Sequence, residues 1–347
     1  MVKKIACFNH KGGVSKTTTT FNLGWKLAEQ GHRVIIIDSD PQCNLTGLVL
    51  GFRGPDELEN FYVNDSGNNV YAGLLPAFES RPYSIVPLDC VEVDQRTGLY
   101  LMAGNIRLSE FETTLGIAQE LTGSIQALQN LPGAFSFLIE STAEALGADF
   151  AIIDMSPGLG AINQNLIGIS DFFLVPAAPD FFSVMAIDSL ARVFPRWRQW
   201  ATQAAALDIL QDAAYPFPKA DTRFLGTVVQ NFRPRGGAPA TSFQRWIDQM
   251  DEAVRDRLIP ALAGAGMMLE PEAYAAVGMN ANSLNLVQIP DFNSLVALSQ
   301  EKQKPVYALT EADTGRSGVV LEGTLRNRDQ FNELFNELAG RVVALTS

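Results

Sequence analysis

Residues 11–18 read Lys11-Gly12-Gly13-Val14-Ser15-Lys16-Thr17-Thr18. They lie between an apolar run at 5–8, typical of a buried strand, and a helical pattern at 17–30. A glycine-rich turn between a strand and a helix, ending in Lys-Thr, is suited to hold phosphate, because its backbone N–H groups and the helix N-terminus point at anionic oxygens. In such a turn we expect Lys16 to reach the β- and γ-phosphates and the Thr17 hydroxyl to bind Mg²⁺.

The common phosphate-binding pattern, G-x-x-x-x-G-K-[ST], is not met, because His10 and Ser15 occupy its two glycine positions. The stretch instead resembles the deviant Walker A motif, K-G-G-x-x-K-[ST], of the ParA/MinD family of ATPases, with Lys11 as the second lysine of that family. Family members usually have glycine where this chain has Ser15, and glycine tolerates backbone angles that serine does not. The alternative is a glycine-rich turn whose threonines cap a helix and which binds no ligand.

Length and composition place the chain among globular proteins. It has 347 residues, 47% of them hydrophobic and 18% charged, and a net charge of −12. No apolar stretch approaches the ~18 to 20 residues that span a bilayer, and the three cysteines form no C-x-x-C pair. We therefore expect a cytoplasmic protein with no membrane partner, disulfide framework or zinc site. The acidic balance argues against a protein that coats nucleic acid with its whole surface.

A second motif follows the apolar strand predicted at 34–37. The strand leads into Asp38-Ser39-Asp40-Pro41-Gln42-Cys43-Asn44, and acids at the carboxyl end of a central strand lie where ligands bind in α/β sheets. The run resembles the family's D-x-D-P-Q-x-N segment. That resemblance implies that Asp40 positions or activates the attacking water and that Asp38 helps hold the Mg²⁺ shell through water. An Asp-Pro turn that caps a helix is the simpler alternative.

A third motif has the form of a Walker B strand. The apolar run 150–153 ends in Asp154, whose carboxylate is expected to order Mg²⁺ and its waters. The family usually continues D-x-P-P-S-x-G, whereas this chain has Ser156 and Gly158 in place of one proline and the serine. Residues 170–182 resemble the family segment that follows.

The base of the nucleotide is assigned by resemblance alone. In the family an amide residue near the end of a strand reads the adenine edge, and the strand predicted at 224–229 is followed by both Gln230 and Asn231. The sequence does not distinguish between them. Pro290 lies in a segment that resembles the family's proline-containing loop beside the base, or else forms a plain turn after a strand at 284–287.

Other parts of the chain are predicted from pattern only. Residues 51–70 are expected to form a surface loop or a short excursion from the sheet, and residues 99–102 a strand. Residues 110–147 look helical with an interruption at Pro132, and a core-packing helix is expected at 329–345. We assign no chemistry to 51–145, where packing or a partner surface is the favoured role.

Residues 181–260 differ in charge from the rest of the chain. They contain ten basic and eight acidic side chains, and three of the four tryptophans. Arginine beside aromatic residues can contact a phosphate backbone, which makes non-specific DNA binding through 192–257 a hypothesis. The same residues can equally cover helix surfaces or form a protein interface.

Together these features predict a single α/β domain over 1–347, with a doubly wound, mostly parallel sheet and helices on both faces, as in P-loop NTPases of the deviant Walker A type. The resemblance implies slow hydrolysis of ATP to ADP and phosphate, and a homodimer in which Lys11 reaches the ATP of the other subunit. It also implies a role in plasmid or chromosome partition, or in cargo positioning, with a ParB-like stimulating partner. The alternatives are an amide-forming synthetase, a metal-cluster carrier, or a positioning ATPase recruited to a scaffold without DNA.

Overall fold

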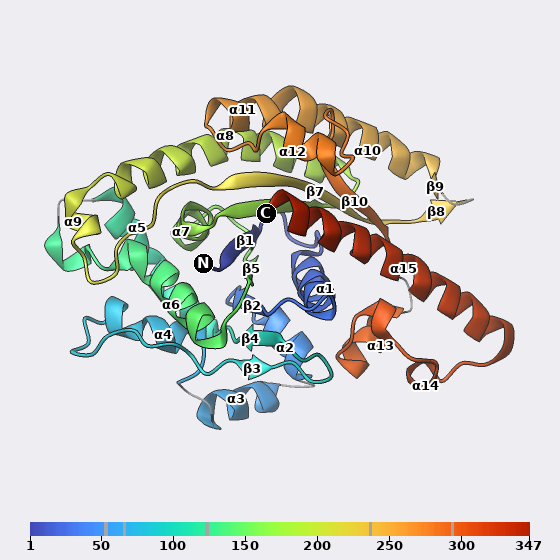
Figure 1. The fold of residues 1–347 in the computed structure, drawn as a ribbon, viewed down its shortest axis with the longest axis horizontal. Coiled ribbons are helices and arrows are strands. Elements are labelled where there is room, and N and C mark those ends of the chain that lie inside the picture. Colours follow the sequence, from blue (N-terminus) through green and yellow to red (C-terminus); the bar gives the residue numbers. More distant parts are fainter. Residues whose placement is uncertain (52–54, 65–66, 122–124, 236–237, 293–294) are drawn as a thin grey trace.

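An eight-stranded sheet runs through the middle of the molecule, in the order β10-β7-β6-β1-β5-β2-β4-β3 (Figure 1). The computed structural model describes residues 1–51, 55–64, 67–121, 125–235, 238–292 and 295–347. The strands of this sheet are β1 (Lys3–Cys7), β2 (Val34–Ser39), β3 (Val91–Glu92), β4 (Leu99–Met102), β5 (Phe150–Met155), β6 (Phe172–Ala177), β7 (Arg223–Phe232) and β10 (Asn285–Pro290).

Neighbouring strands pair in parallel, except for the short edge strand β3, which runs antiparallel to β4. All six residues of β2 and of β5 are buried, as expected for central strands covered by helices on both faces. The predicted α/β fold with a mostly parallel sheet is confirmed. A second, two-stranded antiparallel pair is formed by β8 (Pro234–Arg235) and β9 (Ala238–Pro239).

Helices cover both faces of the sheet, with α1 and α15 on one side and α6 and α7 on the other (Figure 1). The α-helices of the first half are α1 (Lys16–Glu29), α2 (Asn44–Leu50), α3 (Pro55–Asn64), α4 (Val70–Phe78), α5 (Phe111–Glu120), α6 (Leu131–Leu146) and α7 (Ala161–Ile169). Those of the second half are α8 (Phe181–Ala205), α9 (Asp208–Gln211), α10 (Thr241–Ala253), α11 (Ile259–Gly264), α12 (Pro271–Ala276), α13 (Leu295–Lys302), α14 (Glu311–Thr314) and α15 (Gly318–Leu345). No described helix combines the length and the apolar character needed to cross a bilayer.

Four sequence predictions about elements are corrected. The segment 51–70, expected to be a surface loop or a short excursion from the sheet, contains α3. The interruption expected at Pro132 comes earlier, between the end of α5 at Glu120 and the start of α6 at Leu131, so that Pro132 lies in the first turn of α6. The terminal helix begins at Gly318 instead of residue 329, and Pro290 is the last residue of β10 rather than part of a turn after it. Three of these differences concern a helix or strand end, and the fourth is a whole helix, α3, in a segment punctuated by glycine, proline and asparagine.

Candidate functional site

The carboxyl ends of β1, β5 and β2 meet at one edge of the sheet and carry the three predicted motifs. In the parallel register Cys7 lies opposite Asp154, and Asp154 lies opposite Asp38. The loop after β1 leads directly into α1 (Lys16–Glu29). This edge is where ligands bind in open α/β sheets.

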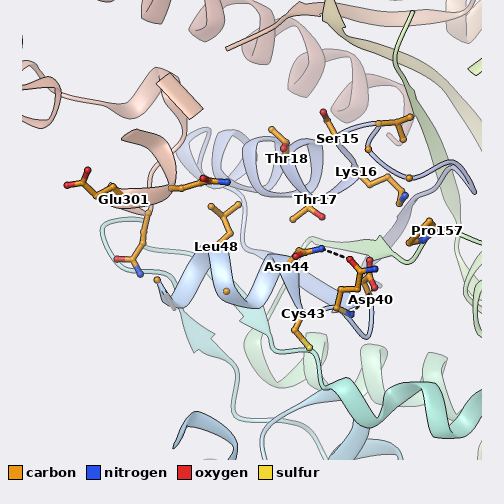
Figure 2. A pocket seen from close by; sticks show the side chains of 18 residues that line it. Ser15, Lys16, Thr17, Thr18, Asp40, Cys43, Asn44, Leu48, Pro157 and Glu301 are labelled. Carbon is orange, nitrogen blue, oxygen red and sulfur yellow. Dashed lines mark hydrogen bonds between the residues drawn. The ribbon is translucent and has the colours of Figure 1, made fainter. Parts of the chain in front are cut away.

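A cavity of about 930 Å³ opens beside this loop and is lined by every residue from Gly12 to Thr18 (Figure 2). The backbone of the loop is tightly turned, with positive φ at both Gly13 (72°) and Ser15 (63°). Ser15 thus takes the left-handed conformation that glycine adopts without strain. Lys16 is buried, and its Nζ donates a hydrogen bond to the Lys11 carbonyl oxygen at 3.2 Å.

Asp154 has the chemistry of a cation site. It is buried, and neither carboxylate oxygen has a hydrogen-bond partner among the described residues. Burial and the neighbouring Asp38 raise its pKa well above the usual range, while the Thr17 hydroxyl and the Lys16 ammonium act in the opposite direction. A buried, unpartnered carboxylate is costly unless a cation neutralises it. Asp154 with the Thr17 hydroxyl therefore fits Mg²⁺ as its protein ligands.

The rest of the cation shell would come from outside the protein. Among the residues that the structure describes, no three His, Cys, Asp or Glu side chains are grouped so that they could hold a metal. Mg²⁺ commonly keeps several waters and is bound through one or two protein groups plus substrate phosphates. The sparse protein ligand set is therefore compatible with a Mg²⁺–nucleotide complex.

Asp38 and Asp40 have different surroundings. Asp38 is buried and accepts hydrogen bonds from the Thr46 backbone N–H (2.8 Å), the Thr46 hydroxyl (2.6 Å) and the Asp40 N–H (3.2 Å). Burial raises its pKa to about 6. Asp40 accepts from the Gln42 N–H at 2.9 Å and lines the cavity. The water-positioning role of Asp40 and the metal-shell role of Asp38 stay predictions; the observed bonds show Asp38 ordering the start of α2.

Lys11 points toward α8 of its own chain. Its Nζ contacts the Asp180 carboxylate at 2.6 Å and the Ser183 hydroxyl at 3.0 Å. Asp180 is also the N-cap of α8, accepting from the Ser183 N–H at 2.8 Å. The second lysine is therefore held within the subunit here, and its contact with another subunit stays a prediction.

None of the three residues predicted to line the base is part of the cavity wall. Gln230 is buried and donates to the Thr19 hydroxyl of α1. Asn231, which has φ of 64°, donates to the Ser15 hydroxyl at 2.8 Å. Pro290 is buried at the end of β10. Of the two amides, only Asn231 contacts the phosphate loop itself, and neither adenine role is tested.

Two groups of residues near the site were not predicted from sequence. The far wall of the cavity is formed by the α2 residues Asn44, Gly47 and Leu48 and by Gln300, Glu301 and Gln303 from α13 and just after it. Asn44 is the last residue of the D-x-D-P-Q-x-N motif, whereas the other five residues belong to no motif, and only folding brings them beside the loop.

The second group, Asn163 and Glu112, stabilises the segment between Asp154 and α7. Asn163 donates through Nδ2 to the carbonyl oxygens of Ser156 (3.0 Å) and Gly158 (3.1 Å), which fixes the turn. Glu112 of α5 accepts from the backbone N–H of Ala161 at the N-terminus of α7. A carboxylate at a helix N-terminus is favourable, so α5 gives structural support to this side of the site.

Several arginines of residues 181–260 form ion pairs with acidic side chains of the same segment. Arg198 and Arg223 contact Asp221, Arg255 contacts Asp256, and Arg257 contacts Asp188. The side chain of Arg235 lies outside the described residues. The exposed arginines on α8 and α10 are Arg192, Arg196 and Arg245. Together with Arg233, which is exposed just after β7, they are fewer than the ten basic residues of the segment.

Comparison with known proteins gives the family of the chain. The family model described as AAA domain matches residues 2–205. An uncharacterized protein of Methanocaldococcus jannaschii is 30% identical over 53% of this chain and 61% of its own, and the chromosome partitioning protein ParA of Caulobacter vibrioides is 29% identical over 57% and 64%. The match thus spans about three-fifths of the length of these curated relatives.

Solved structures share the fold over almost the whole chain. A Corynebacterium diphtheriae protein superposes with a TM-score of 0.64 at 21% identity, covering 99% of both chains. The ATP complex of McdA from Cyanothece gives 0.58 at 17% identity, covering 99% of this chain and 96% of that one. The ParA protein of pNOB8, bound to nonspecific DNA, gives 0.54 at 18% identity, covering 99% and 98%. The phosphate loop, the two acidic strand ends and the matched family model together show that the chain belongs to the AAA-domain family, as a ParA/MinD-like P-loop ATPase domain.

Proposed function

We propose that this protein is an ATP-dependent dimerisation switch that hydrolyses ATP slowly and acts in partition or cargo positioning. The observation that supports it most is the cavity lined by the phosphate loop, together with the buried and unpartnered Asp154 carboxylate at the end of the neighbouring strand β5. Phosphoryl transfer depends on positioning and charge neutralisation more than on covalent chemistry, and this arrangement offers both.

Each group has a proposed role within one subunit. The loop amides and the Lys16 ammonium hold the β- and γ-phosphates, while Asp154 and the Thr17 hydroxyl hold the cation. When bound, Mg²⁺ supplies positive charge that stabilises the leaving phosphate oxygens. Asp40, at the cavity wall, orients the attacking water.

Lys11 links the nucleotide to dimerisation. In the described structure it is paired with Asp180, so it has to leave that carboxylate to reach a nucleotide on another subunit. Because the pair is partly exposed, breaking it costs little compared with a new contact to a triphosphate. ATP then favours the dimer, and hydrolysis removes the group that holds it together.

DNA is the proposed surface on which the dimer acts. The ParA protein of pNOB8 has been solved with nonspecific DNA, and the present chain exposes Arg192, Arg196 and Arg245 on α8 and α10. A few arginines per subunit would be doubled in a dimer, which would make binding depend on ATP. A ParB-like partner would stimulate hydrolysis and release.

The test is binding of Asp40→Ala, with ATP and Mg²⁺, to random-sequence duplex DNA at low and moderate salt. We expect this variant to accumulate as the ATP-bound dimer and to bind DNA with an affinity that falls steeply with salt, because phosphate contacts release counterions. Lys16→Ala, which should not hold ATP, is the matched control. A dimer shown by light scattering that binds no DNA at either salt would reject DNA as the surface.

A protein scaffold is the second candidate, favoured by exposed apolar side chains at the start of α8. Phe181, Phe182 and Met185 are 52%, 66% and 53% exposed. Large exposed aromatic residues mark protein contacts more often than nucleic-acid backbone contacts. An ATP-bound dimer of Asp40→Ala that binds no duplex DNA at either salt would favour this candidate.

A further inference from the structure

We propose that Glu112 of α5 is a positioning residue for ATP hydrolysis, because it holds the turn at residues 156–160 through the N-terminus of α7. The inference rests on the proposed function and concerns a residue that lies outside the cavity wall. The turn joins β5 to α7, and its Pro157 lines the cavity beside the phosphate loop (Figure 2). A contact that fixes this turn therefore also fixes part of the cavity wall.

The N-terminus of α7 is capped from another helix. Its N-cap residue is Gly160, which has no side chain to accept a hydrogen bond, and its first turn contains no acidic residue. The Glu112 carboxylate accepts from the backbone N–H of Ala161 through Oε1 and from that of Ile162 through Oε2, at 3.4 Å for the latter. The first N–H groups of a helix need acceptors, and a carboxylate is favoured there. Glu112 thus replaces the missing cap of α7.

Gly160 leaves room for this carboxylate. A Cβ atom at residue 160 would lie 2.1 Å from Glu112 Oε1, so a side chain there would displace the carboxylate. The backbone of Gly160 is extended, with φ of −79° and ψ of 178°, and any residue adopts that conformation. The absence of a side chain at residue 160 therefore matters for the approach of Glu112 and not for the shape of the backbone.

Helix α5 is itself held against its neighbours. Gln119 Nε2 donates to the Ala161 carbonyl oxygen at 2.8 Å, which adds a second bond from α5 to the start of α7. Trp200 Nε1 of α8 donates to the Gln119 carbonyl oxygen at 3.3 Å. Glu112 is therefore presented by a helix that is fixed on two sides, and it can hold the turn in one position.

The position of the turn should affect the reaction more than the binding of the nucleotide. Residues 12–18 are proposed to hold the phosphates, and Asp154 is fixed inside β5 by the pairing with β1 and β2. Loss of Glu112 leaves both in place, whereas Pro157 and the turn lose their support. A small misalignment at a reacting centre lowers the rate much more than it weakens the binding of a whole ligand.

The first test measures kcat and KM for Mg²⁺–ATP in Glu112→Ala, together with the Kd for ATP by calorimetry. Loss of a helix cap shifts a local equilibrium by about fivefold, so kcat should fall by about fivefold or more. KM and Kd should stay within about twofold of the wild type. Glu112→Gln, which keeps a side-chain oxygen as acceptor, should recover most of the rate, and urea denaturation shows that each variant is folded.

The second test is a double-mutant cycle with Gly160→Ala. This substitution displaces the carboxylate, so alone it should lower kcat about as much as Glu112→Ala. In the Glu112→Ala background it should have little further effect, because the atoms that it displaces are already gone. The control is Glu120→Ala, an exposed acid at the end of the same helix, which should keep the wild-type kcat.

Three results would overturn the role of Glu112 and leave the ATPase proposal standing. They are a wild-type kcat in Glu112→Ala, equal losses of kcat and of ATP affinity, and additive effects of the two substitutions in the cycle. Equal losses would indicate that Glu112 only supports the fold of the site. A wild-type protein that neither binds nor hydrolyses ATP would instead contradict the proposed function itself.

Discussion

At the scale of single residues, Ser15 shows how this chain departs from its family and how the structure accommodates the change. It adopts the left-handed backbone that glycine prefers, and its hydroxyl accepts a hydrogen bond from Asn231. A β-carbon in this region costs roughly 1–2 kcal/mol, and one half-exposed hydrogen bond offsets about 0.5–1 kcal/mol. The hydroxyl therefore recovers part of the strain that its own β-carbon introduces.

Substitutions at Ser15 separate these two effects. Ser15→Ala keeps the strain and loses the hydrogen bond, so the free energy of unfolding should fall by about 0.5–1 kcal/mol. Ser15→Gly loses the bond but removes the strain, and should be about 1 kcal/mol more stable than Ser15→Ala. Urea denaturation of the nucleotide-free proteins measures both values. An alanine variant as stable as the glycine variant would contradict the left-handed assignment.

Lys11 carries the second residue-scale prediction. Because its side chain contacts Asp180 and Ser183 and not the cavity, Lys11→Ala should bind ATP with nearly wild-type affinity. It should remain monomeric with ATP and Mg²⁺, since the group proposed to reach the other subunit is gone. Light scattering with ATP gives the mass, and Lys3→Ala, at the far end of β1, is the control. An ATP-dependent dimer of Lys11→Ala would refute the role of this lysine.

What sequence predicts about the site depends on whether its residues are contiguous. Residues 11–18, Asp40 and Asp154 lie in motifs that combine a strand end with a distinctive residue order, and the structure brings all of them to one edge of the sheet. Glu301 and Glu112 belong to ordinary helices, and no local pattern separates them from solvent-facing acids. Their positions depend on tertiary packing between α13 and α2, and between α5 and α7, which periodicity does not encode.

At the scale of elements, helices and strands were predicted correctly where a contiguous stretch of sequence has a clear hydrophobic pattern, and missed where it does not. β2 and β5 are continuous apolar runs, and such runs specify buried parallel strands. The first part of α15 exposes Val319 and Val320, so it lacks the apolar stripe that marks a helix in sequence. α3 lies in a segment punctuated by glycine, proline and asparagine, which favours a loop in sequence.

Two glycines give a matched test of helix packing. At Gly133 in α6 an added Cβ would lie 2.0 Å from the Tyr215 carbonyl oxygen, whereas at Gly340 in α15 nothing lies within 4 Å. Gly133→Ala should therefore lower the free energy of unfolding by about 3 kcal/mol. Gly340→Ala should raise it by up to about 1 kcal/mol through helix propensity. Denaturant unfolding of both variants is the measurement, and equal effects would show that α6 does not pack as described.

At the scale of the whole molecule, stability and ligand binding are coupled through the orphaned carboxylate of Asp154. A buried carboxyl group without a hydrogen-bond partner destabilises the empty protein, and a cation with its nucleotide removes that penalty. Anything that binds the folded state alone adds RT ln(1 + [L]/Kd) to its stability, about 2.7 kcal/mol at a hundred times the Kd. We therefore expect the free energy of unfolding to be lowered by the empty site and raised again when Mg²⁺ and nucleotide bind.

Asp154→Asn tests this coupling. Without nucleotide the variant should be at least as stable as the wild type, because a neutral amide replaces a group whose charged form is disfavoured by burial. With Mg²⁺–ATP at a hundred times the Kd, the free energy of unfolding of the wild type should rise by about 2.7 kcal/mol, while that of Asp154→Asn should rise much less. When EDTA removes the metal, the ligand-induced gains of the two proteins should become equal. Thermal and denaturant unfolding with and without ligand measure these changes, with Asp89→Asn, an exposed acid, as the control. A variant that is clearly less stable when empty would indicate that Asp154 supports the fold, and one that keeps the full metal-dependent gain would show that the cation binds elsewhere.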